Sequence, residues 1–433
     1  MTDWIGATFT SDVGWDHLER LVDIPSRLAG TAGERRAAEL TREHLEAVGA
    51  RNARLEEFSI QGWERGSSSV ETADRTHESI GLPRSPSDRV TGELVDLGYG
   101  LPEDFDTDLS GSIVLVSSTV PEWYDRFIHR REKYYRAVRA GAAGFIFANH
   151  VEGCLPPTGS VGTADEPIGE IPAVGVAKEV GARLRRRATG DAVTLEVSAK
   201  IEQATSQNVH AELGPDTETE ILLTSHLDGH DISEGALDNG MGTALVVELA
   251  AALARREADL DRRVHIVCFG AEEVGLCGSE YAAERMDLEQ IDAVVNNDGI
   301  GRGRTIRAHT HDFAGIEHAV ETVSERFDHP ISTTPRMGPH SDHWPFVLAG
   351  GVPGLHLMSE TDGRGRGWAH THADTIDKLE SRTLRESAII TTELIVELAS
   401  DSTTLTPRPR SAIVDALENE DLAAGMRLIG DLE

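Results

Sequence analysis

The stretch EILLTSHLDGHDISEGALDNGMGTALVVELAAALARREADLDRRVHIVCFG, residues 220–270, decides the fold class of this chain. It begins with an apolar run at 220–225, continues as a helical pattern opened by glycines at 240–256, and ends in an apolar run at 264–270. Apolar runs of about four to eight residues indicate buried strands, and a helix between two of them makes the strands parallel neighbours. The stretch therefore predicts a strand–helix–strand unit of a parallel α/β sheet.

The alternation extends beyond this unit. Helical patterns and apolar runs continue to alternate at 278–286, 291–298, 315–327 and 351–359. Near the N-terminus, Thr31 and Glu34 have the spacing of a capping box ahead of a helical stripe. We expect an α/β domain with a mixed, largely parallel sheet and helices on both faces, formed by residues 1–85 and 201–400.

The remaining residues have a different sequence pattern from those of this domain. Residues 90–200 contain short strands and glycine turns, which predict a β-rich domain inserted into the larger one. Residues 66–90 are polar and broken by Gly and Pro, which suggests a linker or an irregular excursion. Residues 401–433 are short and polar, and we expect a peripheral tail.

The amino-acid composition argues against some classes of binding partner. The formal net charge is −33, from 74 acidic against 41 basic residues, which argues against nucleic acid or an anionic membrane as a partner. Lysine is almost absent, and so acidic a surface suggests a halophilic protein, adapted to concentrated salt that screens its self-repulsion. Retention of fold and activity after dialysis into dilute buffer would count against this hypothesis.

The cysteine count and the hydropathy of the sequence bear on the cellular compartment of the protein. The three cysteines are too few for a disulfide framework, so we expect reduced thiols. The N-terminus shows no basic start followed by an apolar run, and no stretch of about 18 apolar residues occurs. We therefore expect a soluble, cytoplasmic protein.

Ligand-type side chains follow directly after three of the expected strands: His226, the pair Glu272 and Glu273, and Asp298. The carboxyl ends of strands in an open α/β sheet form ligand crevices, so we expect these side chains to converge. Imidazole and carboxylates without a nearby thiol suit zinc, or a similar ion such as cobalt or manganese. The groups suffice for two ions that share one carboxylate.

Further residues near these strands fit that chemistry better than other hydrolase chemistries. Asp238 stands beside a helix start whose glycines let the backbone pack closely. Adjacent glutamates on a turn point differently, so one can bind metal while the other acts as general base. A serine hydrolase lacks its G-x-S-x-G elbow, Cys268 and Cys277 stand in packing contexts, and no Gly-Lys-Ser or Gly-Lys-Thr loop is present.

Taken together and in order, SHLDGH…ALDNGMG, FGAEEVGLCGSEYAA, NNDGIG, SDHWPF and AHTHADT resemble the M28 family of dizinc aminopeptidases and carboxypeptidases. RLAGTAGERRAAELTREHLEAVGA resembles that family's N-terminal helix region. GSIVLVSS, AGAAGFIFAN and IPAVGVAKEVG, all within 90–200, resemble the protease-associated (PA) domain often inserted in these enzymes. The resemblance covers most of the chain.

The resemblance implies a phosphorylase/hydrolase-like fold and a peptide or small amide substrate. It implies two divalent metal ions, with zinc the first expectation. The implied activity is that of an exopeptidase, in the first place an aminopeptidase, in which a metal-bound hydroxide attacks the N-terminal peptide bond.

The resemblance also implies a set of metal ligands, carried over residue by residue. One ion would be held by His226, Asp238 and Glu273. The other would be held by Asp238, Asp298 and His370, so that Asp238 bridges the two.

Catalytic roles are implied in the same way. Glu272 would be the general base and later the proton donor to the leaving amine. Asp228 would accept a hydrogen bond from His226 and fix its tautomer. His370 is preferred to His372 because HTHADT matches the family's His-Thr-x-x-Asp-Thr from the first histidine.

Other polar residues of these motifs have simpler interpretations. Solvated loop positions are expected for His230, Asp231 and Glu234. Substrate-binding positions, with fixing of the loop as the alternative, are expected for Asp342 and His343, and the same two readings apply to His340. A surface loop is expected for His309 and His311.

Three alternative functions stay open. A carboxypeptidase or other amide hydrolase would need arginines beside the metals to hold a carboxylate. Loop arginines near the motifs keep this alternative open: Arg302, Arg304, Arg336, Arg364 and Arg366. A single-zinc glutaminyl cyclase-like enzyme is less favoured because a full second ligand set is present. The alternative of another class is a non-catalytic, receptor-like binding protein that keeps the fold.

Overall fold

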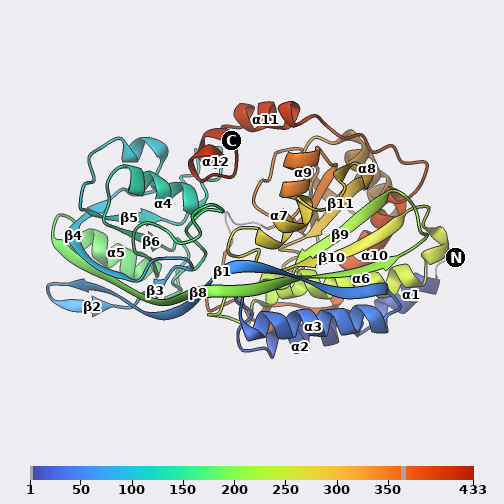
Figure 1. Ribbon diagram of the computed structural model, residues 1–433, viewed down its shortest axis with the longest axis horizontal. Helices are drawn as coiled ribbons and strands as arrows, with labels where there is room; N and C mark the ends of the chain where they lie inside the picture. Colours follow the sequence, from blue (N-terminus) through green and yellow to red (C-terminus); the bar gives the residue numbers. More distant parts are fainter. Residues whose placement is uncertain (1–2, 362–366) are drawn as a thin grey trace.

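A computed structural model, which describes residues 3–361 and 367–433, shows two domains joined by a long ribbon of two strands (Figure 1). The larger domain contains the N-terminal helices and most of the chain after residue 201. The smaller, inserted domain is formed by residues 66–200 and lies at the other end of the molecule.

The connecting ribbon is formed by β1 (Arg51–Thr72) and β8 (Ala192–Leu213), which pair antiparallel along most of their length. The linker prediction for 66–90 was therefore wrong, because these residues continue β1 and add β2 (Arg75–His77) and β3 (Ile80–Gly81). Pairing with β8 satisfies the backbone of the polar, glycine-containing segment. A side chain at Gly66 would meet the carbonyl oxygen of Ser198 at 2.5 Å, so the close approach of the strands requires glycine there.

The sheet of the larger domain runs in the order β13-β12-β14-β11-β9-β10-β8. Its further strands are β9 (Glu220–His226), β10 (Arg263–Phe269), β11 (Ile291–Asn297), β12 (Ile306–His309), β13 (Ile331–Thr334) and β14 (Gly354–Ser359). β10, β9, β11 and β14 are parallel neighbours, whereas β8 and β12 flank them antiparallel. The predicted mixed, largely parallel sheet is confirmed.

Helices cover both faces of this sheet because its central strands are apolar on both sides. In β10, Ile266 and Cys268 belong to one hydrophobic cluster, whereas Val267 and Phe269 belong to another. The first cluster is covered by α3 (Ala32–Ala47), α6 (Gly242–Ala254), α8 (Ala314–Phe327) and α10 (Ser381–Leu398). The second is covered by α7 (Cys277–Ala283) and α9 (Trp344–Gly350).

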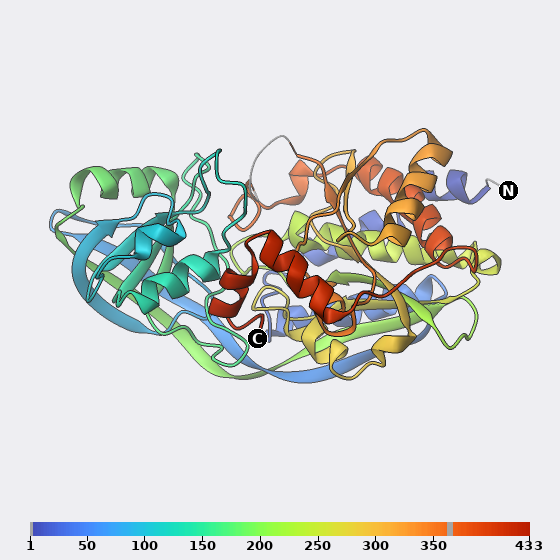
Figure 2. The ribbon, with the colours of Figure 1, turned by 90° about the horizontal axis from the view of Figure 1, so that it is seen from above.

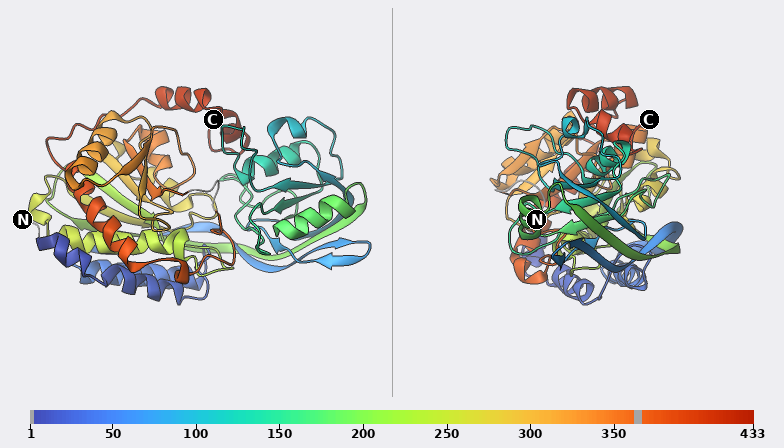
Figure 3. Two further views of the ribbon diagram at one scale, coloured as in Figure 1. Left: turned by 180° about the vertical axis from the view of Figure 1, so that it is seen from behind. Right: turned by 90° about the vertical axis from the view of Figure 1, so that its left-hand side faces the viewer.

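The N-terminal helices and the core helix complete the first layer. α1 (Asp3–Phe9) packs on α10, and α2 (Val13–Val22) packs on α6 (Figure 3). The helical stretch Ala236–Ala254 is long and apolar enough by composition to cross a membrane, but its most apolar 18-residue window is entirely buried inside the protein. It serves here as the central core helix of the domain.

The inserted domain extends the same sheet. β8 pairs with β4 (Asp88–Asp96), and β5 (Ile113–Ser117), β6 (Gly144–Ala148) and β7 (Ala173–Val176) follow as parallel neighbours. α4 (Arg130–Arg139) covers one face and α5 (Lys178–Arg187) the other. The domain thus has two apolar layers of its own.

The C-terminal segment is not the peripheral tail that its polar composition suggested. α11 (Arg410–Asn419) buries Ile413 and Leu417 in the core of the larger domain, and α12 (Ala423–Leu428) packs on α4 of the inserted domain. Arg131 of the inserted domain pairs with Asp431 at 2.6 Å. The segment therefore connects the two domains on the side opposite the ribbon (Figures 1 and 2).

Candidate metal centre

The carboxyl ends of three neighbouring strands bring the predicted site residues together, as expected. His226 ends β9, Glu272 and Glu273 follow β10, and Asp298 follows β11. Asp238 comes from the turn before α6, and His370 comes from the loop after β14. All of these residues except Glu272 and Asp298 are less than a tenth exposed, and those two are only slightly more open.

The distances group the ligand candidates differently from the pairing implied by the resemblance. His370 Nε2 lies 3.0 Å from Asp238 Oδ2 and 3.3 Å from Glu273 Oε2. His226 Nε2 lies 3.3 Å from Asp238 Oδ1 and 3.8 Å from Asp298 Oδ1. Glu273 therefore belongs with His370, and Asp298 with His226, while Asp238 faces both. The sequence could not settle this pairing because strand order, not motif order, decides which side chains meet.

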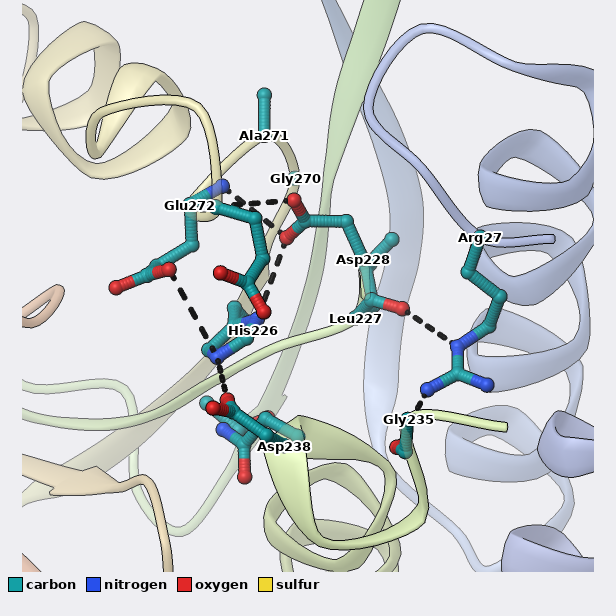
Figure 4. Close-up of polar contacts among 12 residues, drawn as sticks. Arg27, His226, Leu227, Asp228, Gly235, Asp238, Gly270, Ala271 and Glu272 are labelled. Atoms are coloured by element: carbon teal, nitrogen blue, oxygen red, sulfur yellow. Dashed lines mark hydrogen bonds and ion pairs between the residues drawn. The ribbon is translucent and has the colours of Figure 1, made fainter. Parts of the chain in front are cut away.

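Asp228 connects the two strand ends. One of its oxygens lies 3.3 Å from His226 Nδ1 and also accepts from the backbone N–H of Glu272, while the other accepts from the N–H of Glu273, both at 3.1 Å (Figure 4). With its Nδ1 held by a carboxylate, the imidazole of His226 turns Nε2 toward the centre. One fully buried carboxylate thus orients both the histidine and the turn that carries the glutamates.

Glu272 stands at the open side of this cluster, with its carboxylate 4.0 Å from His226 Nε2. Burial, together with the neighbouring carboxylates of Glu273, Asp342 and Asp298, raises its pKa well above the ordinary value against the opposing charge of His226. Burial also raises the pKa of Glu273, to about 7. So many buried carboxylates around two imidazoles need a positive charge among them.

The donor set fits a pair of divalent cations. Glu273 Oε1 is buried and makes no hydrogen bond to any residue that the structure describes. Two groups of atoms are close enough to hold an ion: His226 with Glu272 and Asp298, and His230 with Glu273 and His370. Histidine and carboxylate donors without thiol are those of catalytic zinc sites.

Four polar side chains support the site in roles that were not recognised in the sequence. Arg27, which is buried, donates to the backbone oxygens of Leu227, Glu234 and Gly235, and so fixes the loop between His226 and Asp238 (Figure 4). Arg27 is the first residue of the motif RLAGTAGE, which was interpreted from the sequence only as part of a helix region. A guanidinium with several donors in a fixed fork suits such a cluster of carbonyls.

Glu34 supports the turn that carries Glu272 and Glu273. Its Oε2 accepts from Gly30 N–H at 2.7 Å, and its Oε1 accepts from the hydroxyl of Ser206 and from Ala271 N–H. Thr31 accepts from Glu34 N–H, as the capping box predicts. Burial, with the nearby charge of Asp228, raises the pKa of Glu34 to about 8. The cap residue thereby also holds the turn before Glu272.

Asp374 and Ser341 support individual ligands. Asp374 accepts from the backbone N–H of Leu237 and of Asp238, at 2.7 and 3.1 Å. The hydroxyl of Ser341 donates to Asp298 Oδ2 at 2.7 Å. The motifs AHTHADT and SDHWPF contained both residues, yet the pattern alone did not distinguish them from their neighbours.

The two neighbouring histidines of HTHADT lie in different surroundings. His370 is buried among the carboxylates, whereas His372 is exposed and lies 2.8 Å from the carbonyl oxygen of Ile232. The geometry therefore places His370 in the centre, and His372 outside it.

The expectation of a solvated loop was wrong for His230 and Asp231. His230 is 3% exposed, and its Nε2 lies 2.9 Å from Glu273 Oε2. Asp231 forms a two-pronged ion pair with Arg65 of β1. Glu234 is partly buried and accepts from Ile376 N–H. The sequence did not reveal these contacts, because histidine, aspartate and glutamate are all common on the loops of an acidic protein.

Of the two roles expected in SDHWPF, substrate binding or fixing of the loop, burial favours fixing of the loop for two residues, neither of which lines the cleft beside the centre. Asp342 and His343 are fully buried, and His343 Nε2 lies 3.0 Å from His311 Nε2. His311, expected on a surface loop together with His309, is fully buried, and His309 is partly buried beside it. His309 ends β12 and His343 precedes α9, and the rings of both lie close to that of His311.

A cleft beside the centre is walled by both domains. The larger domain contributes Glu272, Glu273, Gly275, Leu276, Pro339, His340 and His370. The inserted domain contributes His129, Arg130, Arg131 and Ser160, and the C-terminal segment contributes Asp431. His340 is thus the histidine of GPHSDHW that reaches the cleft, where its ring stacks on His129.

Of the loop arginines that kept the carboxypeptidase alternative open, none of the described ones lines this cleft. Arg302 lies over the ring of Trp368, Arg304 pairs with Glu386, and Arg336 donates to a backbone oxygen of the inserted domain. Arg364 and Arg366 lie outside the described residues.

Comparison with known proteins agrees with this site. Residues 208–395 match peptidase family M28, and residues 90–184 match the PA domain. Aminopeptidase YwaD of Bacillus subtilis is 28% identical over 86% of this chain and 81% of its own length. Carboxypeptidase Q of Bos taurus is 26% identical over 87% of this chain and 83% of its own length.

A solved structure, that of BSAP, a zinc aminopeptidase from Bacillus subtilis, is 25% identical with a TM-score of 0.70. The likeness covers 92% of this chain and 97% of that chain. Fold, motif order and both domain matches agree: residues 208–395 form a domain that matches peptidase family M28, and residues 90–184 form one that matches the PA domain.

Proposed function

We propose that this protein is a metallo-exopeptidase with two metal ions that removes N-terminal residues from short peptides. The observation that carries the proposal is the convergence of two histidines and three carboxylates at one sheet edge, with Glu272 beside them. The match to peptidase family M28 and the aminopeptidases among its relatives support it.

The geometry supports two ligand groups that share Asp238. His226 and Asp298 would hold one ion, and His370 and Glu273 the other. Zinc is the ion that best suits these donors and the zinc aminopeptidase likeness. When bound, such a pair of ions lowers the pKa of water and polarises the scissile carbonyl.

Glu272 is the group of this chain placed to move protons. Its carboxylate lies at the cleft and next to the centre, and its raised pKa suits a base that must later release its proton. We assign to it the uptake of a proton from the attacking water and the transfer of that proton to the departing amine. Asp228 keeps the imidazole of His226 in the tautomer that presents Nε2 to the centre.

The cleft supports substrates of limited length. Its outer wall comes from the inserted domain and from the C-terminal segment, so a bound peptide would be enclosed opposite the metal centre. We expect short peptides to enter such a cleft more readily than the termini of folded proteins.

A carboxypeptidase is the second candidate, and one observation favours it. Arg130 and Arg131 line the cleft, and Carboxypeptidase Q is among the relatives. Arginine holds a carboxylate through paired hydrogen bonds. Arg131, however, is engaged by Asp431 at 2.6 Å, which leaves aminopeptidase activity the better-supported choice.

A substrate panel separates these candidates. Amino-acid p-nitroanilides and N-blocked dipeptides are offered in high salt, with and without a chelator. The proposal expects turnover of the p-nitroanilides alone and its loss with the chelator. Turnover of the N-blocked dipeptides alone would support the carboxypeptidase, and absence of all turnover with zinc bound would support a binding protein.

A further inference from the structure

The Glu273–His370 half of the centre has a buried neighbour that the ligand set does not use. His230 is 3% exposed, its Nε2 lies 2.9 Å from Glu273 Oε2, and its ring stands edge-on to that of His370. Its other nitrogen, Nδ1, is buried and makes no hydrogen bond to any described residue. Its Nε2 also lies 3.3 Å from Nδ1 of His370, so the polar contacts described for this imidazole are both to proposed metal ligands.

One arrangement of protons satisfies the contacts that both histidines make with oxygen atoms. With Nε2 of His370 facing the carboxylates, its Nδ1 carries the hydrogen, and the carbonyl oxygen of Thr158 lies 3.3 Å away to accept it. His230 Nε2 then carries its own hydrogen and donates to Glu273. A neutral imidazole has a single N–H to give, and the 2.9 Å contact with Glu273 places it on Nε2.

Thr158 belongs to the inserted domain, so this half of the centre reaches across the domain boundary. Besides its carbonyl contact, Thr158 N–H donates to the carbonyl oxygen of His370 at 2.8 Å. The backbone of Thr158 therefore holds His370 from both sides, by its ring and by its main chain.

A single arginine links the two loops involved. Arg65, on β1, donates to both carboxylate oxygens of Asp231 at 2.6 and 2.8 Å, next to His230 in sequence. It also donates to the hydroxyl of Thr158 at 3.3 Å, and its side chain is only 11% exposed. The planar fork of arginine suits this double engagement, which the single ammonium of lysine does not reproduce.

The other half of the centre shows no such dependence among the described contacts. His226 is oriented by Asp228, and Asp298 is held by Ser341, all within the larger domain. Removing supports of this kind around metal ligands costs about 10–100-fold in metal affinity.

We propose that His230 and the Thr158 loop of the PA domain position Glu273 and His370, and that Arg65 connects the two. Binding of one of the two ions thereby depends on the docked PA domain, whereas binding of the other does not. His230 and Arg65 are positioning residues, since neither contacts the reacting atoms. The inference rests on the metal centre of the proposed function, but not on its reaction.

Metal titration of the full-length protein tests the inference without substrate. Apo protein in high salt is titrated with Zn²⁺ against a competing chelator, and the two binding steps are resolved. For His230→Phe and for Arg65→Met we expect one step to weaken by about 10–100-fold while the other stays unchanged. Ser341→Ala should weaken the opposite step.

Matched variants separate positioning from general damage. His230→Gln, whose amide N–H reaches a similar place, should restore most of the affinity. Arg89→Met, at an exposed ion pair of the same domain, and His318→Phe, on the exposed face of α8, should leave both steps unchanged. Unchanged binding in both His230→Phe and Arg65→Met would overturn the inference, as would equal weakening of both steps.

The outcome is independent of activity. A wild-type protein that binds two zinc ions but cleaves no peptide would end the proposed function and leave this inference standing. Co²⁺ in place of Zn²⁺ gives a second readout, because the absorption of one of its two sites should change in His230→Phe.

Discussion

The two halves of the metal centre differ in the residues that support their proposed ligands. The half around His226 and Asp298 is supported by Asp228 and Ser341 within the larger domain. The half around Glu273 and His370 meets the PA domain through the backbone of Thr158. The difference teaches that an inserted domain can do more than shield a cleft, because here it also contacts the residues proposed to bind metal.

The largest effect is expected where the halves meet, at Asp238. Asp238→Ala removes the carboxylate that faces both His226 and His370, so both ions and turnover should be lost. We expect activity to fall by at least about 10³-fold, since several kcal/mol of electrostatic stabilisation disappear. Metal content by mass spectrometry and p-nitroanilide hydrolysis measure the two effects. Retention of one full ion would show that the halves do not share this residue.

Glu272→Gln should separate chemistry from metal binding. The amide keeps the size of the side chain but cannot take up a proton, so kcat should fall by about 10²–10⁴-fold. Both ions should stay bound, because Glu272 belongs to neither proposed ligand group. Wild-type turnover in this variant would refute the assigned base, and loss of an ion would move Glu272 into the ligand set.

Asp228→Asn addresses the half inside the larger domain. The amide would hold His226 less firmly, and we expect about 10–100-fold weaker binding of one ion. The ion beside His370 should be bound as before, provided the turn of Glu273 keeps its backbone contact. Two-step zinc titration is the measurement, with Asp216→Asn, on a fully exposed side chain, as the control. Weakening confined to the ion beside His370 would contradict the distinction between the halves.

The smallest effect is expected at the contact of the C-terminal segment with the PA domain. Asp431→Asn weakens the pair with Arg131, which helps to keep that domain docked. A loss of about 1 kcal/mol would weaken the His370-side ion by roughly fivefold. Glu418→Gln, at the exposed pair with Arg427, is the matched control. A change confined to the ion beside His226 would contradict the comparison.

The fold was predictable because its signals are local. The apolar runs at 220–225 and 264–270 lie on buried parallel strands, and the helix between them is the core helix α6. The linker at 66–90 was mispredicted because glycine and serine mark loops in isolation, whereas pairing with β8 decides their conformation. The tail was mispredicted because few apolar residues, Ile413 and Leu417 among them, suffice to anchor a short helix.

The site was predictable as a set of residue types but not as a geometry. The strand ends placed His226, the two glutamates and Asp298 at one edge, and the structure brings them together. The pairing of Glu273 with His370 depends on the spatial order of loops that are distant in sequence. The role of His230 depends on burial against the PA domain, for which a histidine on an acidic loop contains no signal.

The most direct test of the central claim is anomalous diffraction at the zinc edge from crystals of the zinc-loaded protein. The account predicts two peaks on either side of the Asp238 carboxylate, one beside His226 and Asp298 and the other beside His370 and Glu273. A single peak, or two peaks that pair His226 with Glu273, would contradict it.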